Sequence, residues 1–216
     1  RNKGGMVANG DVYAFTDSDC IPVPKWLQCG CDSLNYNNPY DLVVGCVEFF
    51  YKKSRAPNGI EVFSSCFEMQ QKHYAEKNRF ATANVFMRRQ VYSEVGFFDN
   101  SRFSGSDFLF AERAEKLNFT FCYSPDAKVL HPARSSYNEI IKKARRKGCA
   151  DRISARSKRF GIPRKLIWYI IRCFDINIQL IRKKISLRNK IAAMPVVFIY
   201  KFAKISALLF PRPSDR

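Results

Sequence analysis

Apolar residues in the first 133 positions come in short runs separated by polar turns. The runs at 12–15 and 41–50 are rich in Val, Phe and Tyr and are bounded by Gly, Asn, Asp or Pro, as buried strands usually are. Shorter runs at 84–87, 119–123 and 128–130 predict three further strands. Helical patterns lie between these strands, so the order of elements predicts an α/β fold.

Three segments of this region have the pattern of helices. Residues 24–35 begin with a proline, which the first turn of a helix tolerates. Residues 59–77 predict one longer helix. Residues 107–117 predict a helix whose first turn is acidic, as the helix dipole favours.

From residue 134 the pattern changes to helical segments rich in apolar and basic residues. A basic helix is predicted over 135–159, a break follows at 161–163, and apolar stretches occupy 166–181 and 191–210. None of these stretches reaches the roughly 18 uncharged apolar residues of a spanning helix.

The last apolar stretch is amphipathic on a helical wheel. Lys190, Lys201 and Lys204 fall within one narrow sector, while Phe202 and Leu209 lie away from it. A helix of this kind lies in a membrane interface more readily than it crosses one.

The net charge of +18 belongs to this tail. Residues 1–133 carry 15 basic and 15 acidic side chains, whereas residues 134–216 carry 22 basic and 4 acidic ones. We therefore predict a globular domain at 1–133 and a basic helical tail at 134–216 with a polyanionic partner. An anionic membrane surface is favoured over nucleic acid, because apolar mass adds little to phosphate contacts. The alternative is helices packed on the domain with a solvated basic face.

Eight cysteines are present, without a Cys-x-x-Cys pair. Most lie inside apolar runs, so we interpret them as buried free thiols, as expected in a reducing cytoplasm.

Two carboxylates one residue apart, Asp17 and Asp19, follow the apolar run at 12–15. Residues i and i+2 of a strand point to the same face, so these side chains can converge on a hard cation such as Mg²⁺ or Mn²⁺. A simple turn at the strand end is the alternative.

The order of several short motifs resembles the family-2 glycosyltransferases of the GT-A fold. The matching segments are Arg-Asn-x-Gly at 1–4, Ala-Asn-Gly-Asp at 8–11, Asp-Ser-Asp at 17–19, Thr-Ala-Asn-Val-Phe at 82–86, Val-Gly-Phe-Phe-Asp at 95–99, Gly-Ser-Asp-Phe-Leu at 105–109 and Val-Leu-His at 129–131. The resemblance covers residues 1 to about 160. It implies a GT-A type, Rossmann-like mixed sheet followed by the helical tail.

In the resembled family a nucleotide-binding half precedes this point. We therefore expect the chain to be an N-terminally truncated part of such an enzyme. The alternative is that Met6 starts a short independent protein.

The resemblance also implies roles for individual residues. Asp17, Asp19 and His131 would hold Mn²⁺ or Mg²⁺. The nucleotide-sugar donor would contact these two aspartates together with Arg1, Asn2 and Arg113, and Asn84 would lie on the acceptor side.

Asp107 takes the place of the aspartate in the family's Glu-Asp pair and is the expected general base. Ser106 departs from the family's glutamate. Alternative roles are a helix cap for Asp107, pairing with Glu112 or Asp126 for Arg113, and a structural hydrogen bond for His131.

The expected function is inverting, metal-dependent transfer of a sugar from a nucleotide-diphosphate sugar to a lipid-linked or cell-surface glycan. The expected location is the cytoplasmic face of the cell membrane. The alternative is a non-catalytic basic module that binds nucleic acid or an anionic membrane. Hydrolysis by the paired aspartates is excluded, because they are too close to flank a glycosidic bond.

Overall fold

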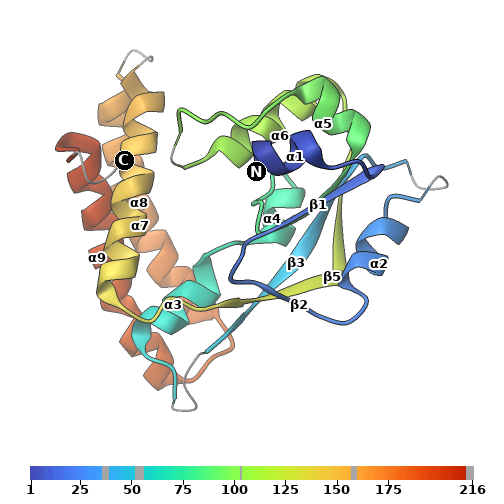
Figure 1. Ribbon diagram of the computed structural model, residues 1–216. Helices are drawn as coiled ribbons and strands as arrows, with labels where there is room; N and C mark the ends of the chain where they lie inside the picture. Colours follow the sequence, from blue (N-terminus) through green and yellow to red (C-terminus); the bar gives the residue numbers. More distant parts are fainter. Residues whose placement is uncertain (36–38, 52–55, 103, 157–159, 213–216) are drawn as a thin grey trace. The chain divides into compact units, whose positions relative to one another are not determined.

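The computed structural model describes residues 1–216 except 36–38, 52–55, 103, 157–159 and 213–216 (Figure 1). The chain forms two compact units. Unit 1 contains Arg1–Phe50, Met69–Ser101 and Gly105–Pro132, and unit 2 contains Tyr51–Glu68, Arg102–Ser104 and Ala133–Arg216.

Unit 1 is built on a mixed five-stranded sheet. Its strands are β1 (Val12–Thr16), β2 (Ile21–Pro22), β3 (Leu42–Phe50), β4 (Asn84–Arg88) and β5 (Phe121–Pro132), in the order β1-β4-β3-β5-β2. Strands β3 and β5 are parallel, and the other neighbouring pairs are antiparallel. The predicted α/β class with a mixed sheet and a helical C-terminal part is confirmed.

The helices of unit 1 pack against both faces of this sheet. Side chains of β4 alternate, so Val85 and Met87 enter one core and Phe86 enters the other. Helices α4 (Gln71–Ala75), α5 (Arg89–Val95) and α6 (Ser106–Lys116) contribute to the first core, and α2 (Trp26–Asp32) contributes to the second. The short helix α1 (Asn2–Val7) opens the chain.

One predicted helix and two predicted strands differ from the structure. The single helix expected at 59–77 is two helices, α3 (Gly59–Phe67) and α4, because the backbone is extended at Glu68 and left-handed at Met69, where φ is 45°. The two strands expected at 119–123 and 128–130 form one strand, β5. A β-bulge joins its halves, since Gly45 lies opposite Ser124 but Cys46 lies opposite Lys128.

Unit 2 is helical and consists of α3, α7 (Tyr137–Arg156), α8 (Gly161–Arg182) and α9 (Leu187–Leu209). Its core combines side chains from all four helices, among them Phe63, Ile140, Leu180 and Val197. The break predicted at 161–163 is the start of α8.

Helix α9 has the predicted amphipathic pattern but buries the basic side. The side chains of Lys201 and Lys204 are buried, whereas Phe202 is 74% exposed. Within the part of the chain that the structure describes, α9 is the helix long and apolar enough to cross a membrane by length and composition. Of its apolar window, 44% is buried inside the protein.

Candidate metal centre and neighbouring site residues

Asp17 and Asp19 lie in a turn that follows β1. Strand β1 ends at Thr16, and the backbone N–H of Cys20 donates to the carbonyl of Asp17 at 3.0 Å before β2 begins. The two aspartates therefore do not share one strand face, because the strand on which that expectation rested has already ended.

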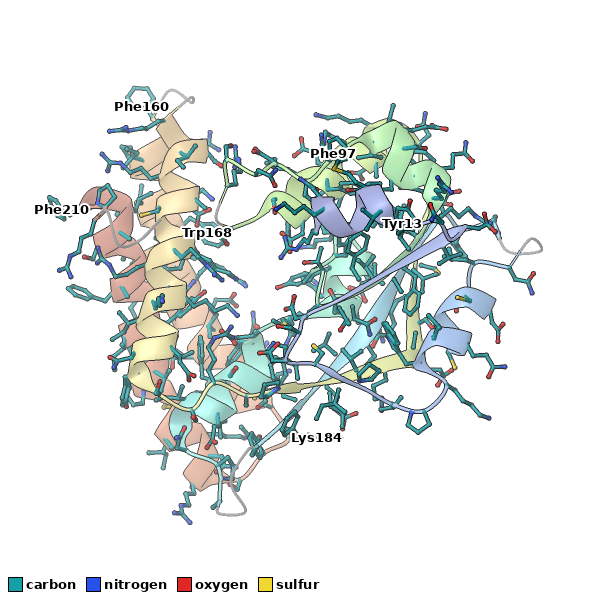
Figure 2. All side chains as sticks on the ribbon, viewed as in Figure 1. Tyr13, Phe97, Phe160, Trp168, Lys184 and Phe210 are labelled. Carbon is teal, nitrogen blue, oxygen red and sulfur yellow. The ribbon has the colours of Figure 1, made fainter. Side chains whose placement is uncertain are left out.

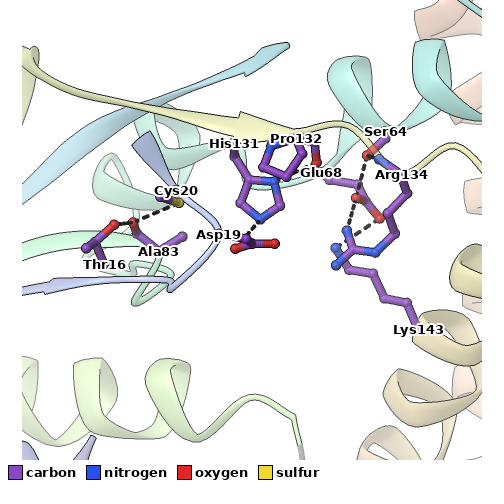
Figure 3. A network of polar contacts seen from close by, with 10 residues as sticks. All are labelled: Thr16, Asp19, Cys20, Ser64, Glu68, Ala83, His131, Pro132, Arg134 and Lys143. Carbon is purple, nitrogen blue, oxygen red and sulfur yellow. Dashed lines mark hydrogen bonds and ion pairs between the residues drawn. The ribbon is translucent and has the colours of Figure 1, made fainter. Parts of the chain in front are cut away.

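The structure instead brings together Asp19, Cys20 and His131 (Figure 3). Their ligand atoms, one from each side chain, all lie within 4.8 Å of one another. Asp17 is not in this group. Its expected role, through water or at the donor's ribose, stays a prediction.

Pairing between β2 and β5 explains why these residues meet. Ile21 lies opposite Leu130 in the antiparallel ladder. Continuing that register by one position brings Cys20 alongside His131, and Asp19 follows in the turn. The sequence places Cys20 directly after Asp19, so these two residues could have been grouped from the sequence alone. The pairing of β2 with β5, which adds His131, could not be read from it.

The imidazole of His131 is oriented as a metal ligand requires. Its Nδ1 lies 2.8 Å from the carbonyl oxygen of Pro132, which can only accept, so the proton is assigned to Nδ1. The lone pair is then on Nε2, which faces Asp19 Oδ1 at 3.7 Å. A backbone carbonyl that accepts from the other ring nitrogen commonly fixes the tautomer of metal-binding histidines.

Burial differs across the group. The His131 side chain is 4% exposed and packs beside the Phe49 ring, whereas the Asp19 side chain is 58% exposed. Burial raises the pKa of the Cys20 thiol, although hydrogen bonds from Thr16 and Asp17 oppose the rise. The three residues thus offer a carboxylate, a thiol and an imidazole, and the group is open to solvent at Asp19. This set of donor atoms fits a divalent cation.

Three residues predicted to bind the donor converge on the loop at 97–100. The Asn2 amide donates to the carbonyl of Phe98 at 2.8 Å and accepts from its N–H at 3.0 Å. Arg113 donates to the carbonyl of Phe97, and the Arg1 guanidinium lies over the Phe98 ring. These side chains hold the loop in place, and their contact with a nucleotide stays a prediction.

Asp107 is the second residue of α6 and is half-buried. The N-cap is Gly105, with φ at 84°, so the alternative of Asp107 as the N-cap is wrong. The Asp107 carboxylate accepts from the Phe108 N–H at 3.0 Å. Arg1 donates to the neighbouring Ser106 hydroxyl at 3.2 Å, which brings a cation to the helix start that carries the expected base.

Asn84 is fully buried within the sheet. Its amide nitrogen donates to the carbonyls of Cys46 and Ala127, both at 2.8 Å, and its oxygen accepts from the Trp26 indole at 2.9 Å. The first carbonyl is in β3 and the second in β5, and both lie next to the register shift between these strands. Both ends of the Asn84 side chain are therefore engaged inside the protein.

The fold places this chain among the α/β proteins, and comparison with known proteins makes that class more specific. No family model matches the chain. The chain is 36% identical over 167 residues to the protein named Glycosyltransferase AglE of Haloferax volcanii, a match that covers 72% of this chain and 53% of that protein.

A second relative from the same organism is named Glucosyl-dolichyl phosphate glucuronosyltransferase. It is 27% identical over 150 residues, which cover 61% of this chain and 46% of that protein. The chain therefore spans about half the length of these curated relatives. Both names support the glycosyltransferase part of the predicted resemblance.

Proposed function

We propose that this chain is part of a glycosyltransferase that moves a sugar from a nucleotide-diphosphate donor to a lipid-linked or cell-surface glycan. Similarity to two proteins named as sugar transferases supports the reaction class. The observation that carries the mechanism is the convergence of Asp19 and His131, which come from distant parts of the sequence.

Asp19 and His131 would hold the cation, Mn²⁺ or Mg²⁺, and Asp17 would assist from the same turn. A bound divalent cation supplies Lewis acidity that neutralises charge on a diphosphate leaving group. The exposed Asp19 carboxylate can meet a donor that arrives from solvent, whereas the buried His131 stays fixed by the Pro132 carbonyl.

Asp107 is the proposed general base for an inverting transfer. An acceptor hydroxyl that attacks the sugar must lose its proton, and a carboxylate outside the metal group can take it. The half-buried position of Asp107 at the start of α6 and the Arg1 contact to Ser106 support this assignment. Arg1, Asn2 and Arg113 would order the loop at 97–100 beside the donor.

Attachment to the cytoplasmic face of the membrane is proposed for unit 2. Helix α8 buries one narrow stripe, formed by Tyr169, Cys173, Ile176 and Leu180. Much of the remaining surface of α8 is apolar and exposed, and it includes Phe174 and Trp168. Trp168 is labelled in Figure 2. An apolar surface of this extent, next to basic residues, is typical of interfacial helices.

Two cations beside this apolar surface support an anionic lipid as the partner. Lys165 and Arg172 lie within 6 Å of the centre of the Trp168 ring, at 5.4 and 5.9 Å. Lys143, Lys201 and Lys204 are buried, so part of the tail's positive charge is not at the surface. This weakens support for nucleic acid as the partner. A relative named for a dolichyl phosphate compound supports a lipid-linked acceptor.

The proposal is tested by Asp19→Ala in an assay of sugar transfer from a panel of nucleotide-diphosphate sugars to membrane lipids. We expect transfer that depends on Mn²⁺ or Mg²⁺ to be lost with the circular dichroism spectrum unchanged, because Asp19 lies in an exposed turn. Asp11→Ala, an exposed change just before β1, is the matched control. Full transfer by Asp19→Ala would exclude this metal site from the mechanism.

A second arm of the same assay uses Asp107→Asn, which keeps the shape of the side chain and removes its basicity. Turnover should fall by roughly two to four orders of magnitude, the usual contribution of general-base catalysis, while donor binding persists. Turnover within a few-fold of the wild type would remove Asp107 from the mechanism.

A further inference from the structure

Cys20 is a member of the metal group that its sequence context did not indicate. It connects the exposed turn at 17–19 to strand β2, and its sulfur lies close to both Asp19 and His131 (Figure 3). Among the residues that the structure describes, this is the group in which three side chains of ligating type come this close.

Asp19 and His131 have nearly the spacing of neighbouring ligands in a tetrahedral site, and the Cys20 sulfur lies within 4.8 Å of both. Bonds of about 2.0–2.1 Å to nitrogen or oxygen and about 2.3 Å to sulfur place neighbouring ligands roughly 3.4–3.6 Å apart. His131 Nε2 and Asp19 Oδ1 are 3.7 Å apart, so little movement is needed between them. The Cys20 sulfur contacts the Ala83 carbonyl at 3.8 Å and also interacts with Thr16 and Asp17. A metal bond would replace these contacts.

The type of donor decides which cation this group prefers. Mg²⁺ takes oxygen ligands in octahedral geometry and has little affinity for sulfur. Zn²⁺ and Co²⁺ accept sulfur, imidazole and carboxylate together. A mixed set of one oxygen, one sulfur and one nitrogen therefore discriminates against the hardest cations.

We propose that Asp19, Cys20 and His131 form a three-ligand site for a thiophilic divalent cation such as Zn²⁺ or Co²⁺, with the fourth position open. On binding, the S–H bond of Cys20 breaks, a sulfur–metal bond forms, and the proton leaves to solvent. This inference rests on the proposed function in one respect, which is that Asp19 and His131 are metal ligands.

The first test is titration of the purified chain with Co²⁺ alone, followed by absorption spectroscopy. A thiolate bound to Co²⁺ produces a charge-transfer band in the near ultraviolet, and we expect this band to saturate at one equivalent. Cys20→Ser should abolish the band and weaken Zn²⁺ binding at least about tenfold, the effect seen when even outer partners of a ligand are removed. Its Mg²⁺ binding should be unchanged.

Cys29→Ser is the matched control, because Cys29 is also a half-buried thiol of unit 1 and lies in α2. The band should persist in this variant. A band that survives Cys20→Ser, a band lost in Cys29→Ser, or no band in the wild-type chain would each overturn the proposal.

A second measurement needs no variant and so does not depend on the folding of one. Zn²⁺ should slow alkylation of Cys20 in the wild-type chain, as measured by mass spectrometry, while Cys29 reacts at its usual rate and Mg²⁺ protects neither. Equal alkylation of Cys20 with and without Zn²⁺ would contradict the site. Neither readout uses sugar transfer, so the two proposals can fail separately. A cobalt band in a protein without transfer activity would refute only the proposed function. Transfer that depends on Asp19 in a protein without a cobalt band would refute only this inference.

Discussion

At the scale of single residues, Asn84 governs the geometry of the strand that carries His131. The register between β3 and β5 shifts after Gly45, and the carbonyls of Cys46 and Ala127 lie next to this shift. The Asn84 amide donates to both. The side-chain amide of Asn84 is therefore already used inside the protein. Any effect of Asn84 on the acceptor side would come from the path that it imposes on β5.

Asn84→Asp tests this role with almost no change in shape. A carboxylate cannot donate to the two carbonyls, and each buried acceptor left without a donor costs about 1–3 kcal/mol. We expect the free energy of unfolding, measured in urea, to fall by at least this amount. Asn9→Asp, at an exposed position before β1, is the control, and an unchanged unfolding midpoint for Asn84→Asp would contradict the role.

At the scale of elements, Glu68 explains why the helix expected at 59–77 is interrupted. Its carboxylate is buried in unit 2, pairs with Arg134 and with Lys143 Nζ at 2.9 Å, and accepts from the Ser64 hydroxyl at 2.7 Å (Figure 3). A helical backbone at Glu68 would direct this side chain elsewhere. The ion pairs therefore outweigh the local helix propensity.

The same contacts make stability depend on pH. Burial favours the neutral acid, but Lys143 and Arg134 outweigh it and lower the pKa of Glu68 from 4.5 to about 2. The folded state then binds its proton less readily than the unfolded state, so this stabilisation is complete above pH 4.5 and is lost as pH falls toward 2. The upper limit of the effect is roughly 3 kcal/mol.

Glu68→Gln should remove this part of the pH dependence. We expect the variant to be less stable than the wild type at pH 6 and the difference to shrink as pH falls below 4.5, as measured by urea unfolding at each pH. The exposed change Glu94→Gln should leave the wild-type pH profile intact. A constant difference between Glu68→Gln and the wild type across this range would argue against the ion pairs.

Basic residues of α7 are also used inside unit 2. Arg145 donates to the Ser206 hydroxyl at 2.9 Å and to the Phe210 carbonyl at 3.2 Å, and Arg152 donates to the Leu209 carbonyl at 2.9 Å. These contacts cap the C-terminus of α9, where a helix favours cations. Part of the charge expected on a solvated face therefore serves to hold two helices together.

At the scale of the whole molecule, the apolar surface of unit 2 is the feature that the proposed membrane attachment explains. Ile167, Ile171 and Phe174 lie on one side of α8, and each is at least 60% exposed. Water-exposed side chains of this size are costly unless a partner covers them. A bilayer interface with anionic lipid would cover them and attract the neighbouring cations.

Vesicles that contain anionic lipid test this attachment by co-sedimentation. The combined change of Ile167, Ile171 and Phe174 to Ser should weaken binding at least about tenfold, because each apolar side chain transferred from water contributes about 1.5–3 kcal/mol. Leu27→Ser with Leu117→Ser, two exposed leucines of unit 1, is the control. High salt should also weaken binding, since it screens surface charge.

Unchanged vesicle binding by the triple variant would contradict an interfacial α8. Resistance of the protein to alkaline carbonate extraction would instead indicate a spanning segment, for which α9 has the required length.

The sequence by itself determined the α/β class and most of the strands and helices, because hydrophobic periodicity and turn residues act over short distances. It also named Asp19 and His131, which the structure brings together with Cys20. It could not determine how distant segments pair. The register of β2 on β5 brought Cys20 to His131, and the end of β1 at Thr16 left Asp17 outside the group.

Only the tertiary structure decided which side of α9 is inside. The helical wheel groups Lys201 and Lys204 correctly, but it cannot reveal that Asp151 of α7 lies 3.1 Å from Lys204 Nζ or that the Trp168 ring lies 5.2 Å from Lys201 Nζ. Charge and aromatic partners from other helices make burial of two lysines tolerable. Burial depends on what surrounds a side chain, and those surroundings come from segments far away in the chain.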